Sequence, residues 1–275
     1  MSEPEPDEEQ HHSAEEFTDW DPSTAPKDFL GIIAAPRRHG KTTALTDWLR
    51  VWHKEKRFTH CMVFSKTLSG YEEYIPACYQ WDNLQNVEGI LDRQMDVAEY
   101  NAKREKKEDM VHSSILLILD DMASEQKEIR TGETGRLMRS IACNGRHICR
   151  EDPLEKNECS CIILTQQLTL YPPSIRNNCD FICSSRLANR FERERLVHES
   201  LTLRTDRDGM KKAYQVLDDV TLSKPYRMII IEKHKANRQV HPDYVYYYDA
   251  DAKAKGVRLF GTERDWQVKK KRIRI

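Results

Sequence analysis

The 275-residue sequence has no long hydrophobic run, no C-x₂-C cysteine pair and no internal repeat. No stretch reaches the roughly 18 apolar residues that a membrane-spanning helix requires. The acidic N-terminus also lacks the basic and apolar regions of a signal peptide. We therefore expect a protein without membrane contact, in the cytosol or nucleus, whose eight cysteines form no disulfide framework.

The densest group of candidate metal ligands is Cys143, His147, Cys149, Cys159 and Cys161. Thiolates and imidazoles are the usual ligands of zinc, which often binds C-x₂-C pairs. No such pair occurs, and Cys161 opens an apolar, strand-like run. We interpret these thiols as buried or interface side chains, and the sequence leaves the zinc alternative open.

Basic residues are absent from the start of the chain and concentrated at its end. Residues 1–26 hold nine acidic side chains and no Lys or Arg, so the remainder carries 44 basic against 36 acidic groups. Residues 269–275 contain five of these positive charges. We predict an acidic, disordered tail at 1–27 and a basic tail at 251–275. The basic body fits a polyanionic partner, although a solvated, frayed terminus explains the basic tail equally well.

Between the two tails, residues 28–250 alternate apolar runs with helical patterns. This alternation predicts one α/β domain with a central, mostly parallel sheet flanked by helices. The expected strands are 29–35, 61–65, 115–119, 161–165, 181–184, 228–232 and 244–248. The expected helices are 42–52, 86–107, 129–142 and a very basic one at 186–195. We read residues 149–160 as a surface insertion.

Residues 32–43 have the layout of a phosphate-binding P-loop at the end of a buried strand. The nucleotide-binding residues we expect are Pro36, Arg37, Arg38, His39, Gly40, Lys41, Thr42 and Thr43. Backbone N–H groups at the start of the following helix favour a bound anion. Lys41 would reach the β- and γ-phosphates of ATP, and the Thr42 hydroxyl would hold Mg²⁺. Ala35 replaces the first glycine of the motif. Loss of this glycine can strain the turn, but Pro36 beside it keeps the bend rigid. Of the two loop arginines we expect only one to contact phosphate.

Two further strands are predicted to end in polar side chains beside this loop. The apolar run that begins at Ser114 ends in Asp120 and Asp121, as in a Walker B motif. The carboxyl edge of an open α/β sheet is where ligands bind, so Asp120 would hold the Mg²⁺ shell and Asp121 would orient or deprotonate the attacking water. Gln166 follows the expected strand 161–165. If this strand lies between strands 29–35 and 115–119, Gln166 would contact the γ-phosphate. An ordinary strand-end amide is the alternative.

The order of these motifs, with Asn144-Gly145-Arg146-His147 and the segment from Gln166 through Pro172-Pro173 to Ile175-Arg176, resembles one known family. It is similar to the poxvirus-type genome-packaging ATPases of large DNA viruses, within the FtsK/HerA superfamily, over roughly residues 28–250. The resemblance implies a RecA-like ASCE P-loop NTPase that forms a homo-oligomeric ring. It also implies that ATP hydrolysis moves double-stranded DNA, without sequence specificity, into a preformed capsid. Capsid or portal components would then be partners, in the host cytoplasm, a viral factory, the virion or the nucleus.

The resemblance places Arg146 and Arg176 in the two arginine-bearing motifs of the family. An arginine finger from a neighbouring subunit would stabilise charge on the transferring phosphoryl group. Either arginine would serve equally well to fix a loop by pairing with a carboxylate. Candidate DNA contacts are the C-terminal basic run and Arg186, Arg190, Arg193 and Arg195, for which ordinary surface solvation is the alternative.

Two other functions remain open at the level of sequence. A small P-loop nucleotide kinase fits the size of the chain, but the Gln166 strand favours hydrolysis over transfer to an acceptor. A non-catalytic, nucleotide-gated scaffold fits the substitution at Ala35, whereas the retained Lys41 and Asp120 favour an active ATPase.

Overall fold

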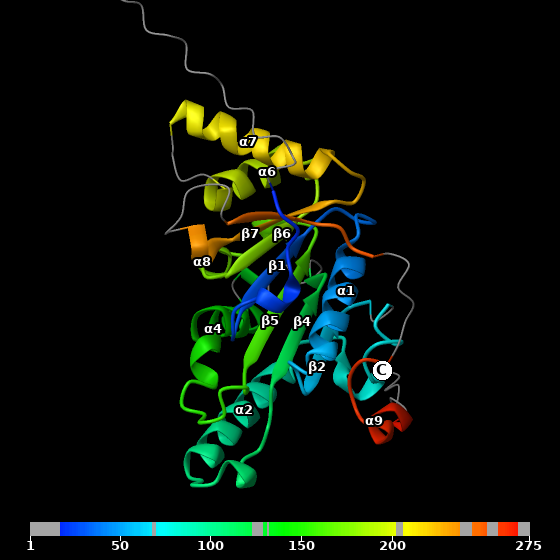
Figure 1. Ribbon diagram of the computed structural model, residues 1–275, viewed down its shortest axis with the longest axis vertical. Helices are drawn as coiled ribbons and strands as arrows, with labels where there is room; N and C mark the ends of the chain where they lie inside the picture. Colours follow the sequence, from blue (N-terminus) through cyan, green and yellow to red (C-terminus); the bar gives the residue numbers. More distant parts are fainter. Residues whose placement is uncertain are drawn as a thin grey trace, which may run out of the picture.

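The computed structural model describes residues 17–67, 70–122, 129–130, 132–201, 206–236, 244–251 and 258–268. Over these residues the chain forms one eight-stranded sheet flanked by helices, in the strand order β3-β2-β4-β5-β1-β6-β7-β8 (Figure 1). The strands are Leu30–Ala34 (β1), His60–Ser65 (β2), Gln80–Trp81 (β3), Ile115–Asp120 (β4), Cys159–Thr165 (β5), Phe181–Ser184 (β6), Met228–Glu232 (β7) and Val245–Tyr248 (β8). The predicted fold class is confirmed.

The sheet is parallel from β3 to β6, and β7 and β8 add to it in antiparallel fashion. Strand β5 lies between β1 and β4 and pairs with both, which meets the condition stated above for a sensor strand. The carboxyl ends of these three strands therefore meet at one edge of the sheet.

Helices cover both faces of the sheet (Figure 1). The longer ones are Lys41–Lys54 (α1), Val87–Ala102 (α2), Glu133–Ile148 (α4), Arg190–Leu196 (α6) and Arg207–Leu222 (α7). The short ones are Pro173–Arg176 (α5), Lys233–Ala236 (α8), Glu263–Gln267 (α9) and a π-helical turn, Val197–Leu201 (η7), with 3-10 turns at Pro22–Thr24 (η2), Ala77–Tyr79 (η3), Lys107–Asp109 (η4) and Leu168–Leu170 (η6). None of the helices in the described part of the chain is long and apolar enough to cross a membrane.

Alternate residues of each central strand enter two separate cores. In β4, Ile115, Leu117 and Leu119 belong to the core that also includes residues of α2 and α4, whereas Leu116 and Ile118 belong to the core on the α1 side. Both sets are almost fully buried. The uninterrupted apolar run of this strand is what burial on both faces requires.

The core on the α1 side is rich in aromatic rings. The ring of Trp20 lies 4.9 Å from that of Trp48 and 5.2 Å from that of Phe181, measured between centroids. Phe181 itself covers Gly31 of β1, where a Cβ atom would lie only 2.4 Å from the ring. Glycine is therefore required at position 31 for this ring to pack against the strand.

The prediction of a disordered tail at residues 1–27 is wrong for residues 17–27. Trp20 is only 2% exposed, and its indole Nε1 donates to Glu232 over 3.0 Å. Asp19 pairs with Tyr247 in a parallel bridge that lies beside β8. Burial of one large ring stabilises this segment despite its acidic average composition. Residues 1–16 lie outside the described residues.

The C-terminal boundary at residue 250 also needs correction. Leu259 and Phe260 are buried on the α1 side, and their backbone N–H groups donate to the Tyr74 carbonyl. Helix α9 follows, begins with a capping box at Thr262 and contacts η3. Residues 258–268 are therefore part of the domain, and the basic run at 269–275 lies outside the described residues.

Residues 149–160 are not a simple surface insertion. Asp152 accepts hydrogen bonds from the side-chain amides of Asn101 and Asn157, and all three residues are buried. Glu158 forms an ion pair with Arg57 at 2.8 Å. The polar composition that suggested a surface loop instead forms a satisfied internal network.

Candidate nucleotide-binding site

The loop between β1 and α1 has the geometry of a phosphate-binding turn. Arg38 and Gly40 adopt left-handed conformations, with φ of 65° and 83°. Helix α1 begins at Lys41, and no side chain caps its N-terminus. The first N–H groups of a 14-residue helix are thus presented at the loop, where the helix dipole favours an anion.

Ala35 causes no backbone strain. It is buried, its N–H donates to the Thr165 carbonyl over 3.0 Å, and its φ is not positive. The residue simply prolongs the pairing of β1 with β5, and the left-handed positions fall later in the loop. The strain that loss of the glycine can cause is therefore absent at Ala35, because a side chain is tolerated where φ is negative.

The Lys41 side chain folds back over the loop. Its Nζ donates to the carbonyl of Ala35 over 2.7 Å and to that of Pro36 over 3.2 Å. Burial lowers the pKa of Lys41, while the nearby carboxylates of Asp120 and Asp121 act in the opposite direction. The ammonium group is therefore positioned between the loop and both acids.

Asp120 ends β4 as a largely buried carboxylate. The Tyr71 hydroxyl donates to its Oδ2 over 2.9 Å, and the same hydroxyl interacts with the Thr42 side chain. Burial raises the pKa of Asp120, with a further increase from Asp121, against the hydrogen bond from Tyr71 and the charge of Lys41. Tyr71 is fully buried and links the two predicted metal ligands, a role that no local sequence pattern signals.

The predicted catalytic acid and the predicted sensor are in contact. The Gln166 amide donates from Nε2 to Oδ2 of Asp121 over 2.8 Å. Asp121 has a left-handed backbone, with φ of 47°, and its N–H donates to the Leu164 carbonyl of β5. The ends of β4 and β5 are thus joined by both a backbone and a side-chain hydrogen bond.

The oxygen atoms at this edge fit Mg²⁺. Thr42 offers a hydroxyl and Asp120 a carboxylate, and Tyr71 interacts with both. Magnesium commonly binds one or two carboxylates together with substrate phosphates and water. Within the described ranges, no three His, Cys, Asp or Glu side chains are grouped so that they could hold a metal ion, so the zinc alternative for Cys143, His147, Cys149, Cys159 and Cys161 gains no support.

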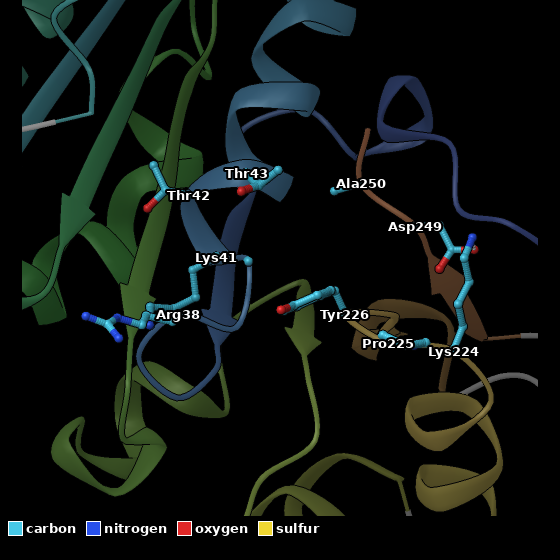
Figure 2. Close-up of a pocket in the computed structure, with 10 residues that line it drawn as sticks. Arg38, Lys41, Thr42, Thr43, Lys224, Pro225, Tyr226, Asp249 and Ala250 are labelled. Carbon is cyan, nitrogen blue, oxygen red and sulfur yellow. Dashed lines mark hydrogen bonds and ion pairs between the residues drawn. The ribbon is translucent and has the colours of Figure 1, made fainter. Parts of the chain in front are cut away.

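A cavity of about 460 Å³ adjoins the loop (Figure 2). One wall consists of Arg38, Gly40, Lys41, Thr42 and Thr43, and the opposite wall of Lys224, Pro225, Tyr226, Asp249 and Ala250. Arg38 is the loop arginine that lines the cavity, although Arg37, Arg38 and His39 are all exposed and Figure 2 draws the Arg38 side chain extending away from Tyr226. The expected nucleotide-binding residues from Arg38 to Thr43, other than His39, are brought together here.

Arg176 lies away from this cavity, in a buried ion pair. It is 4% exposed, and its guanidinium forms two hydrogen bonds of 2.7 Å with the carboxylate of Glu199 in η7. A third bond goes to the Tyr171 carbonyl. This arrangement favours the loop-fixing alternative over an arginine finger. Arg146 lies on α4, and its side chain is outside the described atoms.

The candidate DNA-binding arginines of α6 are largely paired with carboxylates. Arg190 contacts Glu194, Arg195 contacts Glu199, and Arg193 contacts Asp218 of α7. Their charges are partly balanced within the protein, and Arg186 is exposed. Ion pairing of this kind reduces the attraction of these side chains for a polyanion.

Solved structures of P-loop ATPases resemble this fold. B204, the DNA-packaging ATPase from Sulfolobus Turreted Icosahedral Virus, superposes with a TM-score of 0.51 over 82% of this chain and 100% of that chain, at 13% identity. B204 from Sulfolobus turreted icosahedral virus 2, in complex with ATP-γS, superposes with a TM-score of 0.50 over 84% of this chain and 98% of that chain, at 12% identity. EssC (ATPases 2 and 3) from Geobacillus thermodenitrificans superposes with a TM-score of 0.50 over 83% of this chain and 41% of that chain, at 16% identity.

No protein-family model and no curated protein sequence matches the chain. At these identities the structural likeness establishes the fold, an α/β sheet of the P-loop ATPase type. Function must therefore be argued from the residues of this chain.

Proposed function

We propose that this protein is an ATP-hydrolysing, double-stranded DNA translocase that packages a viral genome into a preformed capsid and works as a homo-oligomeric ring. The observation that carries the proposal is the meeting of Lys41, the Asp120-Asp121 pair and Gln166 at the ends of three adjacent strands. The similarity of the fold to the B204 DNA-packaging ATPase supports the link to packaging.

Binding of ATP requires Lys41 to change partners. Its ammonium group exchanges the carbonyls of Ala35 and Pro36 for the β- and γ-phosphates. Thr42 and Asp120 hold Mg²⁺, which neutralises charge on the phosphate oxygens. The N–H groups at the start of α1 complete the anion site.

Hydrolysis depends on the contact between Asp121 and Gln166. The Asp121 carboxylate accepts a proton from the attacking water or orients that water. Gln166 holds this carboxylate through its amide, and the same amide can donate to a γ-phosphate oxygen. Exchange of Gln166 between these two acceptors couples the presence of the γ-phosphate to the position of Asp121.

The proposal is tested by measuring ATP hydrolysis with and without double-stranded DNA. We expect DNA to stimulate the wild type and expect Lys41→Ala to lower the rate by at least about 100-fold. Lys54→Ala is the matched control, since Lys54 is an exposed residue at the opposite end of α1. Transfer of phosphate to a nucleoside, with no effect of DNA, would indicate a kinase and contradict the proposal. Nucleotide binding without hydrolysis would indicate a scaffold.

A further inference from the structure

The cavity beside the P-loop has two ends of different chemistry. The P-loop end is polar and is lined by Arg38, Gly40, Lys41, Thr42 and Thr43. The far end is formed by the turn between α7 and β7 and by the residues after β8. It includes the apolar side chains of Pro225 and Ala250 and the ring of Tyr226. A triphosphate fits the first end, and a nucleoside attached to it extends toward the second.

Tyr226 is the most unusual residue of the far end. Its side chain is 68% exposed, and its backbone is left-handed with φ of 64°. Large aromatic residues rarely adopt this conformation, because it brings Cβ close to the carbonyl oxygen. In Figure 2 the side chain extends from its turn toward the P-loop. Backbone strain combined with an exposed ring beside a ligand site points to a binding role.

The charges at the far end are compensated within the protein. Lys224 Nζ lies 3.0 Å from Asp249, and Arg227 reaches the same carboxylate at 2.6 Å. The Arg227 guanidinium also lies 4.0 Å from the centroid of the Tyr247 ring. These contacts tie the turn before β7 to the residues that follow β8, so the wall that carries Tyr226 is held in place.

We propose that Tyr226 stacks on the base of the bound nucleoside triphosphate, with Pro225 and Ala250 beside it. This inference rests on the proposed function for the identity of the ligand, and it assigns the recognition of the base to the turn before β7. The volume of about 460 Å³ lies in the range of small-ligand pockets. Because Pro225 and Ala250 bear no polar side-chain groups and Asp249 is already paired, recognition by stacking accepts adenine and guanine alike.

The test compares the binding of ATP-γS with that of inorganic tripolyphosphate, both with Mg²⁺, by calorimetry. Tyr226→Asn removes the ring, and Asn tolerates the left-handed backbone. We expect it to weaken ATP-γS binding by about tenfold and to leave tripolyphosphate binding unchanged. Tyr226→Phe keeps the ring and should bind ATP-γS within about twofold of the wild type. Phe191→Ala, which removes an exposed ring from α6, is the control.

Several results would overturn the stacking. The first is an affinity for ATP-γS that is unchanged in Tyr226→Asn, and the second is a loss of affinity in that variant that is equal for ATP-γS and tripolyphosphate. The third is a loss of ATP-γS affinity in Tyr226→Phe as large as that in Tyr226→Asn. The fourth is a wild type that binds tripolyphosphate as tightly as ATP-γS. A preference of more than about tenfold between ATP-γS and GTP-γS would contradict recognition by stacking alone. If the expected pattern is found but DNA does not stimulate hydrolysis, the translocase function fails and the stacking stands.

Discussion

The functional side chains of this protein are hydrogen-bonded to one another and to their own loop. Lys41 binds loop carbonyls, Gln166 binds Asp121, and Tyr71 binds Asp120. Every one of these bonds uses an atom that the proposed chemistry also requires. Nucleotide binding as proposed would therefore require these groups to exchange hydrogen-bond partners.

The first prediction concerns Gln166. Its replacement by Leu keeps a similar volume but removes the amide that holds Asp121, so we expect kcat for ATP hydrolysis to fall by about 100-fold. The dissociation constant for ATP-γS should change by less than about threefold, because Gln166 does not line the cavity beside the P-loop. Gln167→Leu, at the exposed neighbouring position, is the control. Equal losses in kcat and in ATP-γS affinity would show that Gln166 acts in binding.

The second prediction concerns the ion pair between Arg176 and Glu199. Glu199→Gln leaves a buried guanidinium without its charged partner, so the free energy of unfolding should fall by about 3 kcal/mol at pH 7. This value is at the low end for buried pairs, because 18% of the Glu199 side chain is exposed. Chemical denaturation measures the change. Glu194→Gln, which affects an exposed pair with Arg190, should change stability little.

The effect of Glu199→Gln should depend on pH. Burial alone would raise the pKa of Glu199, but the hydrogen bond and charge of Arg176, with Arg195, hold it below its usual value of 4.5. The pair therefore contributes stability above pH 4.5, and this contribution is lost as the pH falls through the lowered pKa. The difference between wild type and variant should shrink over that acidic range. A difference that stays constant would contradict the ionic role.

At the scale of elements, the segment 17–27 acts as part of the domain. Trp20→Ala should lower the free energy of unfolding by about 3 to 5 kcal/mol, because it empties a site among Trp48, Phe181 and Tyr248 and removes the indole hydrogen bond to Glu232. Denaturant unfolding gives the measurement. Phe191→Ala serves as the control, and a similar stability for both variants would show that the segment is dispensable.

The sequence predicted the elements whose signal is local. Strands buried on both faces are uninterrupted apolar runs, and β1, β4 and β5 were found in this way, with the P-loop and the acids of Asp120-Asp121 at their ends. Helix α7 was missed although its local signals are present, with Asp206 as a side-chain cap and a buried stripe that includes Val216 and Val220.

Other features were missed because they depend on contacts between distant segments. Trp20 is buried by Trp48 and Phe181, which the average composition of an acidic tail cannot reveal. Tyr71 and Tyr226 gain their positions beside the P-loop only when β2 and β7 take their places in the sheet. Isolated tyrosines carry no pattern that distinguishes such roles from ordinary packing.

For the whole molecule, we predict binding to double-stranded DNA that depends on salt and little on sequence. A translocating motor grips phosphates, so affinity should fall by at least about tenfold between 50 and 200 mM salt. Fluorescence anisotropy with two duplexes of unrelated sequence measures this. Arg186→Ala tests an exposed candidate, with Arg190→Ala as the ion-paired comparison. Affinity that is insensitive to salt, or a strict monomer in native mass spectrometry with ATP-γS, would contradict the ring motor.

The segment around Trp20 also limits how subunits can join. Asp19 pairs with Tyr247, and backbone bonds of 2.8 and 3.1 Å connect Trp20 and Thr18 to the same residue, so this segment occupies the outer edge of β8. At the opposite edge, β3 is only two residues long. Over the described residues, neither edge offers a long open strand to a neighbour. A ring of such subunits must therefore be built from side-chain surfaces, whose contacts can loosen and re-form in each cycle without unpairing a sheet.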